Sequence, residues 1–87
     1  MIQEMIGEKI VVDLGSPFVC LGTLTRVDEV FLELKNADLH DLRDTDTTRE
    51  NYVADSRATG VKRNRKRVLV VRADVAAVGL LEDVVDD

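Results

Sequence analysis

The chain has 87 residues, of which 45% are hydrophobic and only 3% aromatic, and its formal net charge is −5 at pH 7. This length predicts one domain, 1–87, with a small core of aliphatic side chains. The acidic balance argues against a general nucleic-acid coat protein. The single cysteine, Cys20, excludes an internal disulfide. Without a signal-peptide pattern or a long apolar run, we expect a cytoplasmic protein that does not enter a membrane.

The first seven residues have the pattern of a short helix. Ile2, Met5 and Ile6 recur at the i, i+3, i+4 spacing of an amphipathic helix, and Gly7 is a typical helix end. A helix this short is not stable alone, so we expect it to lie against an apolar surface.

Five later segments combine β-branched residues, apolar alternation and bounding turns, as strands do. They cover residues 9–14, 18–27, 30–37, 68–71 and 75–81. Gly22 lies inside the second segment, where glycine is tolerated if the strand must bend sharply. Because very short turns join several of these segments, we predict an all-β fold, a small five-stranded antiparallel meander that is strongly bent into a barrel.

A long charged insert, residues 38–67, separates the third and fourth predicted strands. Thirty residues without structure would be unusual in so small a domain, so we expect structure within it. Thr47 and Glu50 have the spacing of a capping box, and Gly60 is placed to end a helix of about ten residues. The insert has no continuous apolar face, so extended arms of the flanking strands with a mobile tip fit equally well.

Positive charge concentrates at the end of this insert, in a segment that we call the basic run. It comprises Lys62, Arg63, Arg65, Lys66 and Arg67. Such a run can neutralise several phosphates with a steep salt dependence. It can equally be a solvated loop whose charges pair with acids of the insert or of the C-terminal tail. No aromatic residue interrupts it, so any nucleic-acid contact here would be electrostatic.

Two blocks of the sequence resemble those of the Sm-like (LSm) ring proteins. The matching residues of the first block are Gly22, Asp28, Leu32, Leu34 and Ala37. The second block, residues 71–76, reads Val-Arg-Ala-Asp-Val-Ala and is similar to the family's hydrophobic-Arg-Gly-Asp pattern. The chain is thus identified as a divergent prokaryotic-type member. This implies a bent Sm-like/SH3-like barrel with a short N-terminal helix and a long insert between strands three and four.

The resemblance also implies an RNA-binding site, formed by Asp28 in the turn between strands two and three and by Arg72 and Asp74 in the second block. The alternative is that Asp28 and Arg72 brace two turns as a surface ion pair. Phe31 stands where the family has an asparagine, and Ala73 replaces the usual glycine. Phe31 is either a stacking platform for a splayed base or, like most lone phenylalanines on barrel strands, a core side chain.

The sequence offers little for catalysis. Its one histidine, His40, is far along the chain from Cys20, so no metal-ligand spacing is formed, and Cys20 fits a small buried hydrophobe. No glycine-rich loop precedes a helix in phosphate-binding fashion. We therefore expect no enzyme activity, no cofactor, no metal and no small-molecule substrate.

Residues 68–72 and 75–81 are aliphatic strands without the inward lysine or proline that protects an exposed sheet edge. In Sm-like rings, strand four of one subunit pairs with strand five of the next, a heterologous contact that closes by rotation. The resemblance therefore implies a homo-oligomer of about five to seven subunits, in which Arg72 faces a central pore and the insert crowns one face.

The leading hypothesis is a homo-oligomeric ring that binds single-stranded RNA through Asp28, Phe31, Arg72 and Asp74, with the basic run as an auxiliary patch. A second hypothesis is a scaffold ring that does not bind RNA and holds a protein partner through its charged insert. A third is an OB barrel, which carries a helix between strands three and four and binds single strands as a monomer or dimer.

Overall fold

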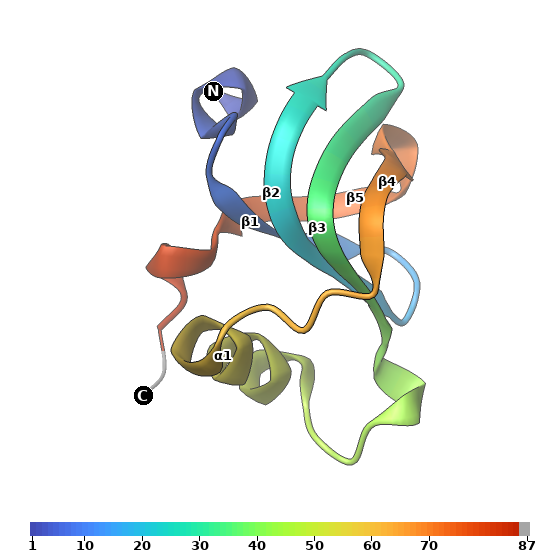
Figure 1. Cartoon of the computed structure of the whole chain (residues 1–87). Coiled ribbons are helices and arrows are strands. Elements are labelled where there is room, and N and C mark those ends of the chain that lie inside the picture. The colour runs from blue at the N-terminus through green and yellow to red at the C-terminus, as the bar shows by residue number, and fades with distance from the viewer. Residues whose placement is uncertain (86–87) are drawn as a thin grey trace.

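The computed structural model of the chain describes residues 1–85 (Figure 1). Within them, five strands form: β1 Lys9–Leu14, β2 Phe18–Val27, β3 Phe31–Asp41, β4 Arg65–Val71 and β5 Val75–Leu80. The α-helix α1 is Arg49–Thr59, and short 3₁₀ turns occupy Ile2–Met5, Leu42–Asp44, Arg72–Asp74 and Leu81–Asp83. The predicted all-β fold is confirmed. No helix in this part of the chain is long and apolar enough to cross a membrane.

The strands form one antiparallel sheet in the order β4-β3-β2-β1-β5. Strands β1 to β4 pair with their neighbours in the chain, but β5 pairs with β1, with Ile10 opposite Leu80 and Val12 opposite Val78. Figure 1 shows β5 passing behind the curved sheet, which gives the barrel its shape. As described, β4 and β5 are therefore the two edges of the sheet, each paired along one side.

Gly22 allows the sharp bend of β2 because its neighbour strand comes unusually close. A Cβ atom at position 22 would lie 3.1 Å from both the Cα and Cβ atoms of Ala37 and 3.1 Å from the carbonyl oxygen of Lys35. The pairing of β2 with β3 also shifts register between Leu21 and Thr23. The prediction of a glycine needed for a bent strand agrees with this geometry.

Alternating side chains of the strands build two cores on opposite faces of the sheet. The inner core fills the barrel and consists of Ile10, Val12, Cys20, Leu24, Leu32, Leu34, Ala37 and Val70. The outer core lies between the other face of β1 and β2 and the insert, and consists of Val11, Val19, Leu21, Val53 and Leu81. Each aliphatic side chain buried this way contributes about 1.5–3 kcal/mol. The second core explains why both faces of β1 and β2 are apolar.

The N-terminal helix forms as one 3₁₀ turn, Ile2–Met5, rather than one and a half turns of α-helix. Ile2 and Met5 pack against the inner core, as the spacing predicts. Ile6 lies beyond the turn with 46% of its surface exposed, so its assignment to the apolar face is wrong. The tighter 3₁₀ repeat ends before a residue at i+4 reaches the same face.

The insert is shorter and more ordered than the sequence indicates. β3 continues to Asp41 and β4 begins at Arg65, so strands take up both ends of residues 38–67. Both alternatives therefore hold in part: the flanking strands extend, and a helix forms between them. Figure 1 shows α1 below the barrel.

The helix α1 begins and ends with recognisable caps. The Oγ1 atom of Thr48, not of Thr47, accepts a hydrogen bond from the Asn51 N–H at 3.1 Å. At the other end, Gly60 adopts a φ of 100°, which other residues rarely adopt. Val53 and Ala54 are buried, and Val53 belongs to the outer core. Packing on the sheet thus stabilises a helix whose sequence lacks a continuous apolar stripe.

Candidate nucleic-acid interface

The turn between β2 and β3 is organised by Asp28. Its Oδ1 atom accepts hydrogen bonds from the N–H groups of Val30 (2.8 Å) and Phe31 (2.7 Å). The hydrogen bonds from Phe31 and Val30 lower the pKa of the Asp28 carboxyl. The Asp28 N–H also donates to the Phe31 carbonyl oxygen at 3.0 Å, which closes the hairpin. The carboxylate therefore shapes the turn.

Arg72 lies beside this turn at the end of β4, although it is 44 residues away in the chain. Its Nη1 atom donates to the backbone carbonyl oxygen of Asp28 at 2.6 Å, and its N–H donates to the Val30 carbonyl oxygen at 2.7 Å. The expected brace between Asp28 and Arg72 exists, but it is a hydrogen bond to the backbone rather than an ion pair. A guanidinium has five N–H donors. Within residues 1–85, the Asp28 contact is the only side-chain hydrogen bond of Arg72.

Phe31 is on the surface, so its interpretation as a core side chain is wrong. Phe31 lies directly opposite Val71 in the β3–β4 pairing and shares its side of the sheet with the exposed Leu69, and Val30, in the preceding turn, is exposed as well. The exposed fractions of these residues range from 36% for Phe31 to 55% for Val30. Asp28, Phe31 and Arg72 therefore meet at one end of the barrel and form what we call the turn cluster.

Asp74, the fourth predicted site residue, is oriented by a different neighbour. Its carbonyl oxygen accepts a hydrogen bond from the Gly15 N–H at 2.9 Å, which ties the β4–β5 connection to the β1–β2 turn. Asp74 also lines a shallow apolar groove of about 210 Å³ with Phe18 and residues 68–71 of β4. No hydrogen bond or ion pair joins the Asp74 and Arg72 side chains in the described chain.

The basic run lies at the opposite end of β4 from the turn cluster. Phe31 pairs with Val71 at one end of the β3–β4 ladder, and Ala37 pairs with Arg65 at the other. Six residues of strand span about 20 Å. Lys62 and Arg63 precede β4, whereas the other three members of the run are strand residues rather than a loop.

The basic run forms a hollow with residues of β3 that sequence reasoning missed. The hollow, about 540 Å³, is lined by Lys35, Asn36, Arg63, Asn64, Arg65 and Lys66. Arg63 donates to the Oδ1 atom of Asn36 at 3.2 Å, and Arg67 lies 4.0 Å from the Glu33 carboxylate. Lys35 was recognisable as an outward-facing residue by its alternation. The position of Lys35 opposite Arg67 was not recognisable, because the register between two strands depends on how they pair in the folded sheet.

A buried polar cluster behind this hollow fixes the insert to β3. Asp38, only 1% exposed, accepts hydrogen bonds from the Tyr52 hydroxyl and from the Asn64 amide. Burial, and secondly the hydrogen bond to Asp38, raise the pKa of the Tyr52 hydroxyl. The Tyr52 ring stacks on the His40 ring, with ring centroids 3.9 Å apart. The Asn64 amide also exchanges two hydrogen bonds of 3.1 Å with the backbone of Leu39. These contacts pin α1 and the start of β4 in place.

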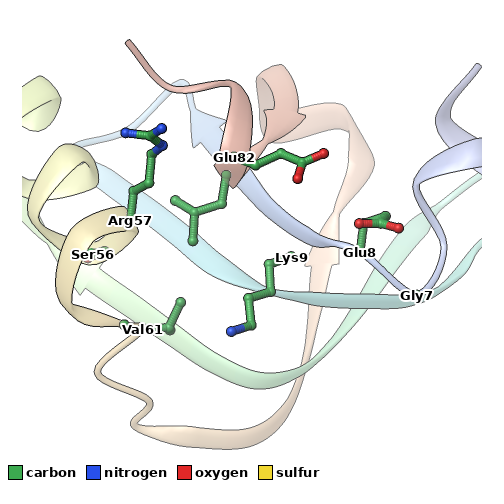
Figure 2. Close-up of a pocket in the computed structure, with 9 residues that line it drawn as sticks. Gly7, Glu8, Lys9, Ser56, Arg57, Val61 and Glu82 are labelled. Carbon is green, nitrogen blue, oxygen red and sulfur yellow. The ribbon is translucent and has the colours of Figure 1, made fainter. Parts of the chain in front are cut away.

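Other candidate sites do not converge on a ligand. Figure 2 shows a pocket of about 390 Å³ between α1, β1 and the C-terminal segment, whose charged side chains Lys9, Arg57, Glu8 and Glu82 point in different directions. No group of three or more metal-ligating side chains is present in the described part of the chain. Cys20 is fully buried, and burial, followed by the nearby Asp38 charge, raises its pKa to about 12.

The architecture to compare with solved structures is a strongly bent five-stranded antiparallel barrel with two free edges, β4 and β5. The chain is similar to the Sm protein of Pyrococcus abyssii in complex with a uridine heptamer, with 16% identity and a TM-score of 0.63 over 91% of this chain and 90% of that one. It is also similar to an Sm-like protein of Archaeoglobus fulgidus, with 20% identity and a TM-score of 0.62 over 92% and 88%. No family model and no curated protein matches the sequence.

The chain therefore has the fold of Sm-like proteins, as its two sequence blocks predict. The OB-barrel alternative is wrong, although the helix between strands three and four that suggested it is present. In this chain β3 pairs directly with β4, and β5 pairs with β1.

Proposed function

We propose that this protein binds single-stranded RNA at the turn cluster and acts as a ring of identical subunits. The observation that carries the proposal is that an exposed Phe31 ring lies beside the same turn as the Arg72 guanidinium. One N–H of this guanidinium is bonded to the Asp28 carbonyl oxygen, and its other N–H donors can bind a ligand. The complex of a similarly folded Sm protein with a uridine heptamer supports this choice of ligand.

The chemistry of the turn cluster suits an unpaired nucleotide. Splayed bases stack on aromatic rings and on guanidinium planes, and the remaining N–H donors of Arg72 can bind a phosphate or a base acceptor. Asp28 has a positioning role, because its carboxylate holds the turn and its carbonyl holds Arg72. Asp74 is exposed in the same three-residue turn as Arg72, whose connection to β1 is fixed by the Gly15 N–H, and it stays a candidate contact residue.

The two free sheet edges support assembly. Leu69 and Val71 of β4 are exposed by 52% and 43%, which leaves an aliphatic edge strand uncovered. β5 at the other edge is aliphatic as well. Joining β4 of one copy to β5 of the next would satisfy both edges, and such a heterologous contact forms a closed ring when the rotation from one subunit to the next closes.

RNA binding is tested by fluorescence anisotropy with a labelled uridine heptamer. Phe31→Ala and Arg72→Lys should each weaken binding about tenfold, because they remove a stacking ring and a planar guanidinium respectively. Arg57→Lys, an exposed change on α1, is the matched control and should bind like the parent. Equal affinity of all four proteins would contradict the proposed site. A ring that does not bind the heptamer would instead favour the scaffold hypothesis.

Assembly is tested by light scattering on a sizing column. Leu69→Lys should give a folded species of smaller mass, because a lysine on the exposed face of β4 opposes edge pairing. Val70 is unsuitable for this test, since it is 5% exposed within the inner core. Ala58→Lys, on the exposed side of α1, is the control. If Leu69→Lys keeps the full oligomeric mass, β4 is not the joint.

A further inference from the structure

We infer that the basic start of β4 binds the acidic segment after β5 of a neighbouring copy, so that the basic run is part of the subunit joint. This inference rests on the proposed ring and goes beyond it, because it assigns the run to a protein partner of known chemistry rather than to phosphates. It follows from the opposite distribution of charge along the two sheet edges.

The two edges have opposite charge gradients. β4 begins with Arg65, Lys66 and Arg67 and ends in aliphatic residues. β5 begins in aliphatic residues and leads directly into a 3₁₀ turn that carries Glu82 and Asp83. Each edge is therefore half apolar and half charged, with positive charge on one and negative charge on the other.

These charges have almost no partners within one subunit. All members of the basic run are exposed, and in the described residues their one ion pair is the 4.0 Å contact of Arg67 with Glu33. Glu82 and Asp83 are exposed as well and form no ion pair within residues 1–85. The expected pairing of the run with acids of its own insert is thus not observed in the described part. The complementary charges remain available to a second copy.

The two charge gradients favour antiparallel over parallel pairing of β4 with the β5 of a neighbouring copy. In an antiparallel arrangement, Val71 opposite Val75 places Leu80, the last residue of β5, opposite Lys66, so the acidic turn that follows Leu80 comes next to the basic run. A parallel arrangement would carry the acids to the far end of β4, away from the run. Antiparallel pairing also matches every strand pair in the sheet.

The same arrangement covers the apolar halves of both edges. Leu69 and Val71, exposed in one subunit, would lie beside the first residues of β5 in the next. The apolar part would supply affinity through burial, and the charged part would fix direction and register. Like charges at the wrong register repel, so the two gradients also disfavour misaligned pairing.

The experiment reverses the charge of one edge at a time. Arg65→Glu/Lys66→Glu changes β4, and Glu82→Lys/Asp83→Lys changes the segment after β5. Each variant should raise the dissociation concentration of the oligomer at low salt by about tenfold or more, measured by light scattering. Arg26→Glu/Arg57→Glu has the same change in net charge as the β4 variant and lies elsewhere, so it should assemble like the parent.

Mixing the two reversed variants gives the decisive measurement. Each β4 edge then finds a complementary β5 segment only on the other variant, so the mixture should assemble at protein concentrations at which each variant alone stays dissociated. Because the two kinds of subunit must alternate around a closed ring, native mass spectrometry should find even subunit numbers. Neutral variants, Arg65→Gln/Lys66→Gln among them, replace any reversed variant that circular dichroism shows to be unfolded.

The remaining outcomes overturn the inference in distinguishable ways. If the reversed β4 variant keeps its full mass but loses uridine heptamer binding, the basic run is a phosphate patch, and the proposed ring stands. If the mixture does not assemble while the parent does, the two charged segments do not meet. A parent that is monomeric at all concentrations would overturn the proposed ring itself, before any variant is compared.

Discussion

The guanidinium of Arg72 donates a 2.6 Å hydrogen bond to the backbone carbonyl of Asp28, while the Asp28 carboxylate accepts two backbone N–H groups of its own turn. The two residues are therefore joined without neutralising each other through a direct ion pair. The guanidinium is held in position and its positive charge is available to an anionic ligand. This arrangement separates the roles of the two residues in any nucleic-acid contact.

The salt dependence of RNA binding should distinguish the members of the turn cluster. Arg72→Ala should weaken binding and reduce the slope of log affinity against log salt by about one, because one cation is removed per site. Phe31→Ala should weaken binding with an unchanged slope, since the ring carries no charge. Anisotropy titrations with the uridine heptamer from low to high salt measure both. Identical slopes for the two variants would contradict these roles.

Gly22 should tolerate substitution poorly. In Gly22→Ala, the new methyl group meets Ala37 at 3.1 Å with little room on either strand, so the free energy of unfolding should fall by about 1–3 kcal/mol. Gly79→Ala is a matched control, because a Cβ atom there has no neighbour within 4 Å. Urea unfolding measures both. Equal stability of the two variants would show that the sheet relaxes at the bend.

The polar cluster of the insert should behave as one unit. Tyr52→Phe removes a hydrogen bond to the buried Asp38 carboxylate and should lower the free energy of unfolding by about 1–3 kcal/mol. Asp38→Asn alone should destabilise as well. The double variant should lose less than the sum of the two, because each single change leaves a partner unsatisfied. Additive losses in urea unfolding would show that the two side chains act independently.

Acid should weaken the turns at both ends of β3. Backbone hydrogen bonds lower the pKa of Asp28, and hydrogen bonds from Arg43 lower the pKa of Asp41 to about 2. An aspartate has a pKa of about 4 in the unfolded chain. Because the pKa of each of these two carboxyls is lower in the folded protein, its ionised form stabilises the fold at a pH above about 4. That contribution is lost as the pH falls through the carboxyl's folded-state pKa. Urea midpoints of Asp28→Asn and Asp41→Asn should therefore depend less on pH between about 5 and 2 than those of the parent. Parallel curves for parent and variants would contradict this cause.

Cys20 should react only when the barrel opens. Its side chain is fully buried and its pKa is raised to about 12, so the thiol stays protonated at neutral pH. A thiol reagent such as iodoacetamide should label the native protein far more slowly than the urea-unfolded chain, as followed by mass spectrometry. A variant that loosens the inner core, Leu34→Ala, should react faster. Rapid labelling of the native parent would contradict the packing of β2.

Much of the fold follows from local pattern. Residues 9–14 alternate apolar side chains between two faces and form β1 as predicted, and Gly22 marks the bend in β2. The end of β3 was less visible, because Asp38 and His40 are polar residues in a strand. Asp38 is buried there by partners from positions 52 and 64. Such long-range compensation cannot be read from local alternation.

The sequence suggests candidate site residues but not how they lie relative to one another. The two sequence blocks identify Asp28 and Arg72, yet only the β3–β4 register brings them together. The exposure of Phe31 was unpredictable, since a lone phenylalanine on a strand is usually core. Lys35 also joins the basic hollow through pairing alone.

Arg72 occupies the three-residue turn Arg72–Asp74 that joins the two edge strands β4 and β5. A ligand held at that residue therefore touches the short connection between the two surfaces through which the proposed ring is built. If RNA binds the assembled form more tightly than the free subunit, assembly must strengthen RNA binding by the same factor that RNA strengthens assembly. Oligomer formation and RNA binding would then be coupled equilibria, and the apparent RNA affinity would depend on the protein concentration.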